Sequence, residues 1–493
     1  MRRRLHITLT GLAAMLAFTG TARAAAITVN TITDASAAGS CSLRDAITAS
    51  NNVAAVNGCS AGTGTDIINF SVSGTIVLSA ALPYIQSALT VDGSGQSITI
   101  SGNNAALVFA ATGEALTLRY LTIINGNGFY LGNVPAGAVY FGSSGNLNID
   151  HCTFSANATA WNPTNIRPAS ASSGAVVSLG PATITNSTFT GNGSTVAVGG
   201  ALALSSDSTI SNSTFAGNTG YGGAVAQYSF IAGGSAGLSV ANSTFNGNSA
   251  AAVGYAADIQ IFNFAHLNIG NTILAGSLLG ADCVNNGGYA ITVTGTNLVT
   301  DNSCAISGAL TVPPILGPLA NNGGPTQTIA LMNGSPAISA GSLALCTTAP
   351  VNSLDQRGMP RPGAGKSTCD IGAYEYQETV FPFTGFFAPV ANADVNIVKA
   401  GQAVPINFSL GSNLGLNIFA AGYPVVQQSA CLSGLTQSTV ETVTAGASSL
   451  SYNATSNTYT YVWKTSSAWA GTCGQFVMRL TDGTFHMANF QFK

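Results

Sequence analysis

The hydrophobic and polar positions of this chain repeat in a short phrase that occurs four times. Each copy places a threonine directly before a phenylalanine and an asparagine three residues after it. The phenylalanines follow one another after 35, 26 and 30 residues, and this irregular spacing suits stacked coils that have short strands and loops of variable length. The four repeats contain Phe154, Phe189, Phe215 and Phe245, closed by Asn157, Asn192, Asn218 and Asn248.

A second motif, Gly-Ala followed by an aliphatic residue, alternates with the first. It occurs at Gly137, Gly174, Gly200 and Gly223. Short alternating runs of Ile, Val, Leu, Thr and Phe are typical of strands, and the long amphipathic stretches of helical repeats are missing from the sequence. A single coil cannot bury its apolar face alone, so coils must stack on one another. The pattern predicts an all-β chain that begins with a right-handed parallel β-helix, in which the four phenylalanines are structural. This predicted architecture resembles the pectin-lyase-like solenoid.

An asparagine opens three of the repeats, at Asn186, Asn212 and Asn242. Asparagine tolerates positive φ and can hydrogen-bond to the asparagine of the next coil. We therefore expect these three residues to form a structural ladder along the stack. The same positions also fit Asn-x-Ser/Thr glycan acceptors, but that interpretation needs a eukaryotic secretory context.

The N-terminus is typical of an exported protein. Arg2-Arg3-Arg4, an apolar stretch and Ala22-Arg23-Ala24 predict a signal peptide over residues 1–24. An amphipathic helix follows, with Leu43, Ala46 and Ile47 at helical spacing, and we expect it to cap the β-helix over residues 25–316. The mature chain carries no further apolar span, so the location expected is extracellular or on a bacterial cell surface.

Charge is scarce along the whole chain. Only 6% of the residues are charged, and removal of residues 1–24 leaves 10 Lys and Arg against 17 Asp and Glu. No Lys or Arg occurs between Ala169 and Asn352. This distribution lacks the basic patch of a nucleic-acid-binding protein, so we expect no nucleic-acid partner.

Nine cysteines in an exported chain predict disulfides. Sequence proximity favours Cys41 with Cys59, Cys283 with Cys304, Cys346 with Cys369, and Cys431 with Cys473, although sequence alone leaves other pairings open. Cys152 is left over and takes the place of a serine in the other repeats. We expect a buried free thiol there rather than a nucleophile, because His151 is its only basic neighbour.

Several motifs resemble those of known families. The string from Cys41 to Ile47 resembles the N-terminal signature of exported bacterial β-helix proteins, and the paired repeat motifs resemble the passenger repeats of polymorphic outer membrane proteins. Residues 317–377 resemble the choice-of-anchor Q region that ends many bacterial surface β-helices. Residues 378–493 resemble the PxKF module, which implies an Ig-like β-sandwich, although the lysine of that motif is Asn407 here.

The densest charge cluster lies in the anchor-like region, at Asp355, Arg357, Asp370 and Glu375. Carboxylates in such a cluster could bind calcium or act in catalysis. Buried charges are usually paired, however, so we expect a structural network that ties the last coil to its cap. The sequence otherwise calls for no cofactor.

Two functional classes compete on this fold. A polysaccharide lyase needs calcium-binding carboxylates and a basic residue, and a glycoside hydrolase needs paired carboxylates. Between Ala169 and Asn302 the only titratable candidates are Asp207, Asp258, Asp282, Asp301 and His266, with no acids adjacent in sequence. This scarcity favours a non-catalytic scaffold for adhesion or for binding a glycan or a surface protein.

The earlier coils hold a second candidate set, namely Glu114, Arg119, Asp150, His151 and Arg167. Asp150-His151 is the best local pair for catalysis, but an isolated acid and histidine beside a strand more often lie on a surface turn. A third class, an autotransporter passenger, is raised by the repeat resemblance. It requires a C-terminal membrane barrel, and the last 110 or so residues resemble a sandwich instead.

Overall fold

The computed structural model divides the chain into two compact units, residues 1–376 and residues 377–493. Nearly all of the predicted signal peptide lies outside the described part of the chain. The structure describes residues 24–112, 114–130, 134–142, 145–159, 172–193, 197–229, 236–377, 381–420, 422–428, 431, 437–440, 449–482 and 484–493.

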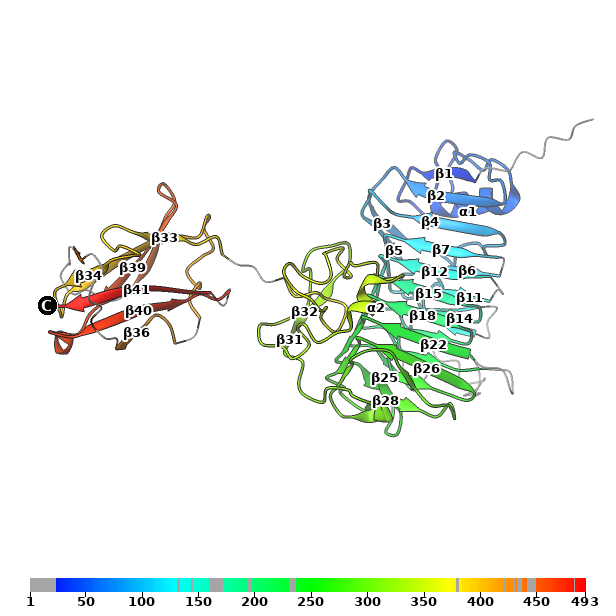
Figure 1. The fold of residues 1–493 in the computed structure, drawn as a ribbon. Helices are drawn as coiled ribbons and strands as arrows, with labels where there is room; N and C mark the ends of the chain where they lie inside the picture. Colours follow the sequence, from blue (N-terminus) through cyan, green and yellow to red (C-terminus); the bar gives the residue numbers. More distant parts are fainter. Residues whose placement is uncertain are drawn as a thin grey trace, which may run out of the picture. The chain divides into compact units, whose positions relative to one another are not determined.

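The N-terminal unit is a parallel β-helix built from three long sheets (Figure 1). The ten-stranded sheet contains β1 (Ala25–Val29), β2 (Thr65–Phe70), β4 (Ala88–Asp92), β7 (Leu116–Arg119), β12 (Leu147–Asp150), β15 (Ala182–Thr185), β18 (Ser208–Ser211), β22 (Ala236–Ala241), β26 (Ala265–Gly270) and β29 (Thr292–Val293). The nine-stranded sheet contains β3 (Gly74–Val77), β5 (Ile98–Ser101), β8 (Leu121–Ile124), β13 (Thr153–Ser155), β16 (Thr188–Thr190), β19 (Thr214–Ala216), β23 (Thr244–Asn246), β27 (Ile273–Ala275) and β30 (Leu298–Val299). The seven-stranded sheet contains β6 (Phe109–Ala111), β11 (Val139–Phe141), β14 (Val176–Ser178), β17 (Leu202–Leu204), β21 (Val225–Gln227), β25 (Ala256–Ile261) and β28 (Ala281–Asn285).

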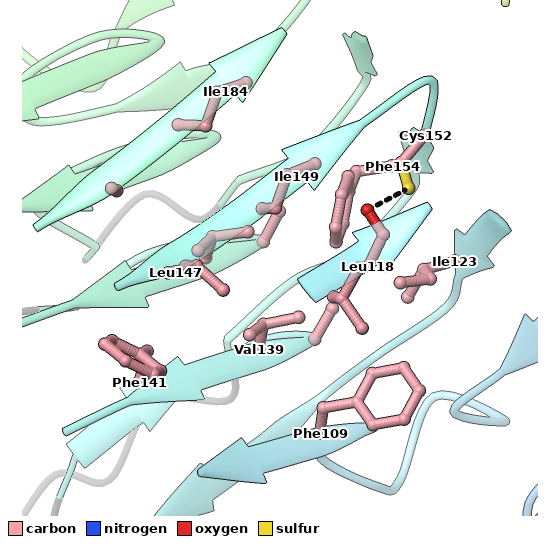
Figure 2. Packing of buried hydrophobic residues seen from close by; sticks show 14 of the residues in the cluster. Phe109, Leu118, Ile123, Val139, Phe141, Leu147, Ile149, Cys152, Phe154 and Ile184 are labelled. Atoms are coloured by element: carbon pink, nitrogen blue, oxygen red, sulfur yellow. Dashed lines mark hydrogen bonds between the residues drawn. The ribbon is translucent and has the colours of Figure 1, made fainter. Parts of the chain in front are cut away.

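Successive strands of one coil belong to different sheets, and each strand pairs in parallel with its counterpart in the next coil. In the coil that contains β11, β12 and β13, the side chains of Phe141, Ile149 and Phe154 all point into one shared core (Figure 2). Side chains alternate between the two faces of a strand, so alternate residues of most strands in the ten- and nine-stranded sheets are buried, whereas most strands of the seven-stranded sheet are buried at every position. The parallel β-helix expected from the repeat pattern is confirmed.

The repeated phenylalanines form a continuous stack inside the solenoid. Ring centroids of Phe154 and Phe189, and of Phe189 and Phe215, are 4.9 Å apart, and those of Phe215 and Phe245 are 4.5 Å apart. The rings are nearly parallel and fully buried. The in-register pairing of β13, β16, β19 and β23 places one ring above another.

Helix α1 (Leu43–Asn52) and four disulfides stabilise the described chain in addition to the sheets. The helix begins at Ser42, whose side chain accepts a hydrogen bond from the Asp45 amide, and it buries Leu43, Ala46 and Ile47. The four cysteine pairs expected from sequence proximity are confirmed: Cys41–Cys59, Cys283–Cys304, Cys346–Cys369 and Cys431–Cys473. Disulfides of this number are typical of proteins that work in an oxidising environment outside the cytoplasm.

The first unit also has several short elements outside its three long sheets. The second unit is built from two β-sheets. The first unit also contains β9 (Gly128–Tyr130), β10 (Val134–Ala136), β20 (Thr219–Gly220), β24 (Ser249–Ala250), η1 (Ser303–Ala305), β31 (Leu316–Ala320), β32 (Thr328–Leu331) and α2 (Leu343–Thr347). The second unit contains β33 (Thr384–Phe387), β35 (Ala403–Ser409), β39 (Thr458–Lys464) and β38 (Leu450–Asn453) in one sheet, β36 (Val425–Gln428), β40 (Cys473–Arg479), β41 (Phe485–Phe492), β34 (Val395–Val398) and β37 (Gln437–Thr439) in the other, and η2 (Ser467–Trp469). An aromatic core that includes Phe408, Trp463 and Phe490 fills this unit.

Candidate functional site

A row of threonines runs along the outer face of the nine-stranded sheet. The parallel register aligns one threonine from each of seven consecutive strands: Thr75, Thr99, Thr122, Thr153, Thr188, Thr214 and Thr244. Each threonine precedes a buried Ile or Phe, so the pleat turns its hydroxyl outward. Neighbouring hydroxyls are therefore separated by about 4.8 Å, the spacing of hydrogen-bonded strands.

A second row lies in the turn that connects the ten-stranded sheet to the nine-stranded sheet. One residue of each turn has a left-handed backbone, with φ between 46° and 52° at Tyr120, His151, Asn186, Asn212 and Asn242. Asparagine adopts this conformation most readily among residues with a side chain, which accounts for its recurrence in the later coils. Tyr120 and His151 occupy the same turn in the earlier coils.

The asparagines predicted to form the ladder are only partly linked to one another. Asn212 Nδ2 lies 3.4 Å from Asn186 Oδ1, a long hydrogen bond, whereas no bond between Asn212 and Asn242 occurs among the described residues. Their side-chain amides instead donate to the later segment from Asn322 to Tyr376. Asn212 Nδ2, for example, donates to the Leu354 carbonyl at 2.9 Å. Asn212 and Asn242 are 2% and 0% exposed, so neither can carry a glycan.

The continuous ladder is made by the asparagines that close the repeats. Asn157 donates to Asn192, Asn192 to Asn218, and Asn218 to Asn248, through Nδ2–Oδ1 distances of 2.9, 3.0 and 3.0 Å. Backbone amides of the same residues donate to the same oxygens. Asn192, Asn218 and Asn248 also donate to the phenylalanine carbonyl of the preceding coil. The Phe-x-x-Asn spacing carried this signal, so the prediction that Asn186, Asn212 and Asn242 form the ladder was placed on the wrong asparagine of the repeat.

The segment from Asn322 to Tyr376 covers the later half of the threonine row. Thr188 Oγ1 donates to the Gln327 carbonyl at 2.5 Å, and Thr214 Oγ1 donates to Gln356 Oε1 at 2.6 Å. The Ala373 amide donates to Thr244 Oγ1 at 2.9 Å. All three threonines are consequently buried to 1% exposure or less.

A buried charge network holds this docked segment in place. Arg357 pairs with Asp355 at 2.6 Å, and Arg361 Nε lies 3.4 Å from Glu375 Oε2. Arg361 is 1% exposed and also donates to Asn242 Oδ1 at 2.9 Å. The four predicted residues do come together, and Arg361 joins them as a member that the sequence analysis did not include.

The network does not fit a calcium ion. Both oxygens of each carboxylate, in Asp355, Asp370 and Glu375, already accept hydrogen bonds from backbone amides or from arginine. Burial raises the pKa of Asp370 and of Glu375, in the latter against the charge of Arg361. Within the described ranges, no group of three or more His, Cys, Asp or Glu side chains could hold a metal ion.

The earlier half of the threonine row is open. Thr75, Thr99, Thr122 and Thr153 are exposed or half-buried, and in the described part of the chain their hydroxyls have no hydrogen-bond partner. Beside them in the turn row, the rings of Tyr120 and His151 stack with centroids 4.7 Å apart and planes at 9°. Both residues directly follow a strand of the ten-stranded sheet and precede a strand of the nine-stranded sheet, so the aromatic pair lies at the junction of the two sheets.

Three charged residues end the neighbouring strands of the ten-stranded sheet, next to the aromatic pair. Arg119 forms an ion pair with Asp92, and Asp150 Oδ2 lies 2.9 Å from His151 Nδ1. Burial acts to raise the pKa of Asp150, but hydrogen bonds from His151, Thr185 and Asn186 outweigh it and lower that pKa to about 2. Asp150 is therefore ionised at any physiological pH.

We name the open surface the upper ridge: Thr75, Thr99, Thr122, Thr153, Asp92, Arg119, Tyr120, Asp150 and His151. Of the candidate set in the early coils, Arg119, Asp150 and His151 meet there. Glu114 precedes β7, at the opposite end of that strand from Arg119, and Arg167 falls outside the described ranges. Asp92 and Tyr120 complete the ridge, and only the register between coils could have identified them.

A second acidic site brings together acids of the later coils that are not adjacent in sequence. Asp282 and Asp301 are 19 residues apart in sequence, yet the Asp282 amide donates to Asp301 Oδ2 at 2.9 Å. The Asp282 carboxylate accepts from Ser277 Oγ at 2.5 Å and from Thr300 Oγ1 at 2.8 Å. Asp258 Oδ1 accepts from Asn248 at the end of the ladder, and burial raises the pKa of Asp258 well above its usual range.

Two of the three carboxyl groups of this site are closed off from solvent, whereas Asp301 is exposed. Asp282 is 1% exposed and Asp258 is fully buried, so neither carboxyl can reach a substrate in this conformation. Stacked coils bring these residues together, which sequence adjacency could not reveal.

The remaining candidate is Cys152, which is a buried free thiol. Its Sγ lies 3.4 Å from the Leu118 carbonyl oxygen (Figure 2). Burial raises the pKa of Cys152 to about 12, so the thiolate needed for a nucleophile does not form at neutral pH.

Comparisons with protein-family models, with curated proteins and with solved structures found no match to this chain. No helix within the described ranges is long and apolar enough to span a membrane.

Proposed function

We propose that this chain is an exported, non-catalytic β-helix scaffold that binds its ligand at the upper ridge. The resemblances to choice-of-anchor Q and PxKF modules support a place in the cell-surface or secreted fraction. Four disulfides fit the same compartment.

One observation carries this proposal. The threonine row continues without interruption from β3 to β23, and the chain covers only its later half with its own residues. In the covered half, Thr188, Thr214 and Thr244 hydrogen-bond Gln327, Gln356 and Ala373, which are three separate positions of the docked segment. The open half offers threonine hydroxyls of the same kind, together with the rings of Tyr120 and His151 and the charged side chains of Asp92, Arg119 and Asp150.

A polysaccharide hydrolase acting at Asp282 and Asp301 is a second candidate. Burial raises the pKa of Asp282, whereas hydrogen bonds from Ser303 and Asp282 outweigh burial and lower the pKa of Asp301. Carboxyl groups with pKa values shifted in opposite directions are what an acid and a base require. The burial of Asp282 counts against this candidate, because a catalytic acid must reach the glycosidic oxygen.

A binding screen that also detects products separates the two candidates. The purified mature chain is tested on polysaccharides and surface proteins, with and without calcium, for retained protein and for released reducing or unsaturated ends. Retention without product, weakened in the Tyr120→Asn/His151→Asn variant, supports the scaffold. Product release that is lost in Asp282→Asn would establish the hydrolase instead.

A further inference from the structure

Resting on the proposed function, we infer that the ligand of the upper ridge is a neutral polysaccharide that lies along the solenoid axis, across successive coils. The class of ligand follows from the hydrogen-bonding capacity, the charge and the apolar content of the ridge.

The hydroxyls of the row both donate and accept. In the covered half, Thr188 Oγ1 donates to the Gln327 carbonyl and accepts from Gln356 Nε2 at 2.8 Å. A ligand that replaces the docked segment must therefore present donors and acceptors together, repeated along its length. The hydroxyl groups of a sugar chain do this, because each is both a donor and an acceptor.

The charges of the ridge favour a neutral sugar chain over an acidic one. Arg119 is the one permanently positive side chain of the upper ridge, and it is paired with Asp92. Asp150 adds a further negative charge, since its pKa is about 2. An acidic polysaccharide would meet two carboxylates and no unpaired arginine here, whereas carboxylates and a guanidinium can hydrogen-bond the hydroxyls of a neutral one.

The apolar content argues against a folded protein partner. Stable protein interfaces have a desolvated core with aromatic and aliphatic anchors. Beside the open threonines, Val77 is the one large aliphatic side chain of the described residues of β3, β5, β8 and β13 that is strongly exposed, at 50%. The Tyr120 and His151 rings stack on each other from one coil to the next, so they present their edges and polar atoms, rather than an apolar anchor, to a chain that lies along the solenoid axis.

The variants that test this inference use the chain's own later coils as a template. Asn186, Asn212 and Asn242 show that asparagine fits the turn at positive φ, so Tyr120→Asn/His151→Asn removes both rings without disturbing the backbone. Tyr221→Asn is the matched control, because Tyr221 is an exposed aromatic residue, at 36%, on a different loop. Thermal melting of each variant verifies that it is folded.

Dissociation constants are measured for soluble neutral glucan, mannan and xylan, for polygalacturonate and alginate as acidic chains, and for chitosan as a cationic chain. We expect a neutral chain to bind most tightly, the double variant to bind it about tenfold more weakly, and Tyr221→Asn to match the wild type within about twofold. If only acidic or cationic chains or proteins bind and the double variant weakens them, the ligand class is wrong and the site stands. If binding is unchanged in the double variant, the upper ridge itself is wrong, and if nothing binds, both proposals fail.

Discussion

Asn218 provides the sharpest test of how the solenoid is held together. Its Oδ1 accepts from the backbone amide and from Nδ2 of Asn192, each at 3.0 Å, and its Nδ2 donates to the Phe189 carbonyl at 2.9 Å. The residue is fully buried, so Asn218→Ala leaves the Asn192 amide and the Phe189 carbonyl without their side-chain partner. A buried polar group without a partner costs about 1–3 kcal/mol, and two such groups predict a loss of about 3 kcal/mol in the free energy of unfolding.

Urea unfolding followed by far-UV circular dichroism measures this loss, because two of the three tryptophans lie in the second unit and their fluorescence would report mainly that unit. Asn246→Ala is the matched control, since Asn246 is half-buried and its side chain makes no hydrogen bond with the described residues. We expect the control to change stability by no more than about 0.5 kcal/mol. If Asn218→Ala lost no more than the control, the ladder would not be a source of stability and the reasoning would be refuted.

Three further outcomes follow from buried groups. Arg361→Ala leaves Glu375 as an unpaired buried acid and should destabilise the docked segment by about 3–5 kcal/mol. Hydrogen exchange in residues 322–376 should then be faster, and unchanged exchange would contradict this prediction. Because the folded pKa of Asp258 is raised, its stabilising contribution is complete below its unfolded pKa, about 3.9, and is lost as the pH rises through the folded value. Asp258→Asn should therefore match the wild type near pH 3 and exceed its urea midpoint at pH 8, whereas equal midpoints at both pH values would refute the assignment. Cys152, with its pKa near 12, should react with a thiol reagent only after unfolding, and rapid reaction of the folded protein would show that the coil opens.

The repeat pattern was sufficient to predict the coils, because strand alternation is local. A threonine before a buried phenylalanine must face outward, and equal strands stack in register. The pattern was not sufficient to predict what lies on that outer face. Gln356 contacts Thr214 across 142 residues, and no local preference specifies such a contact.

The charged residues also include one cluster that the sequence predicts and one contact that it does not. Asp355 and Glu375 could be identified because several charged residues occur between them in a chain that has few charges. The contact between Asp282 and Asp301 was missed because it depends on the length of the whole coil from β28 to β30. Tyr120 joins His151 for the same reason, as an equivalent turn one coil earlier.

The most direct test of the account is a hydrogen-exchange footprint of the mature chain bound to a soluble neutral polysaccharide. The account predicts slower exchange in the peptides that cover residues 119–124 and 150–155, with residues 322–376 and the second unit unchanged. Slower exchange confined to residues 277–303 or to residues 384–492 would contradict it and would place the ligand elsewhere on the chain.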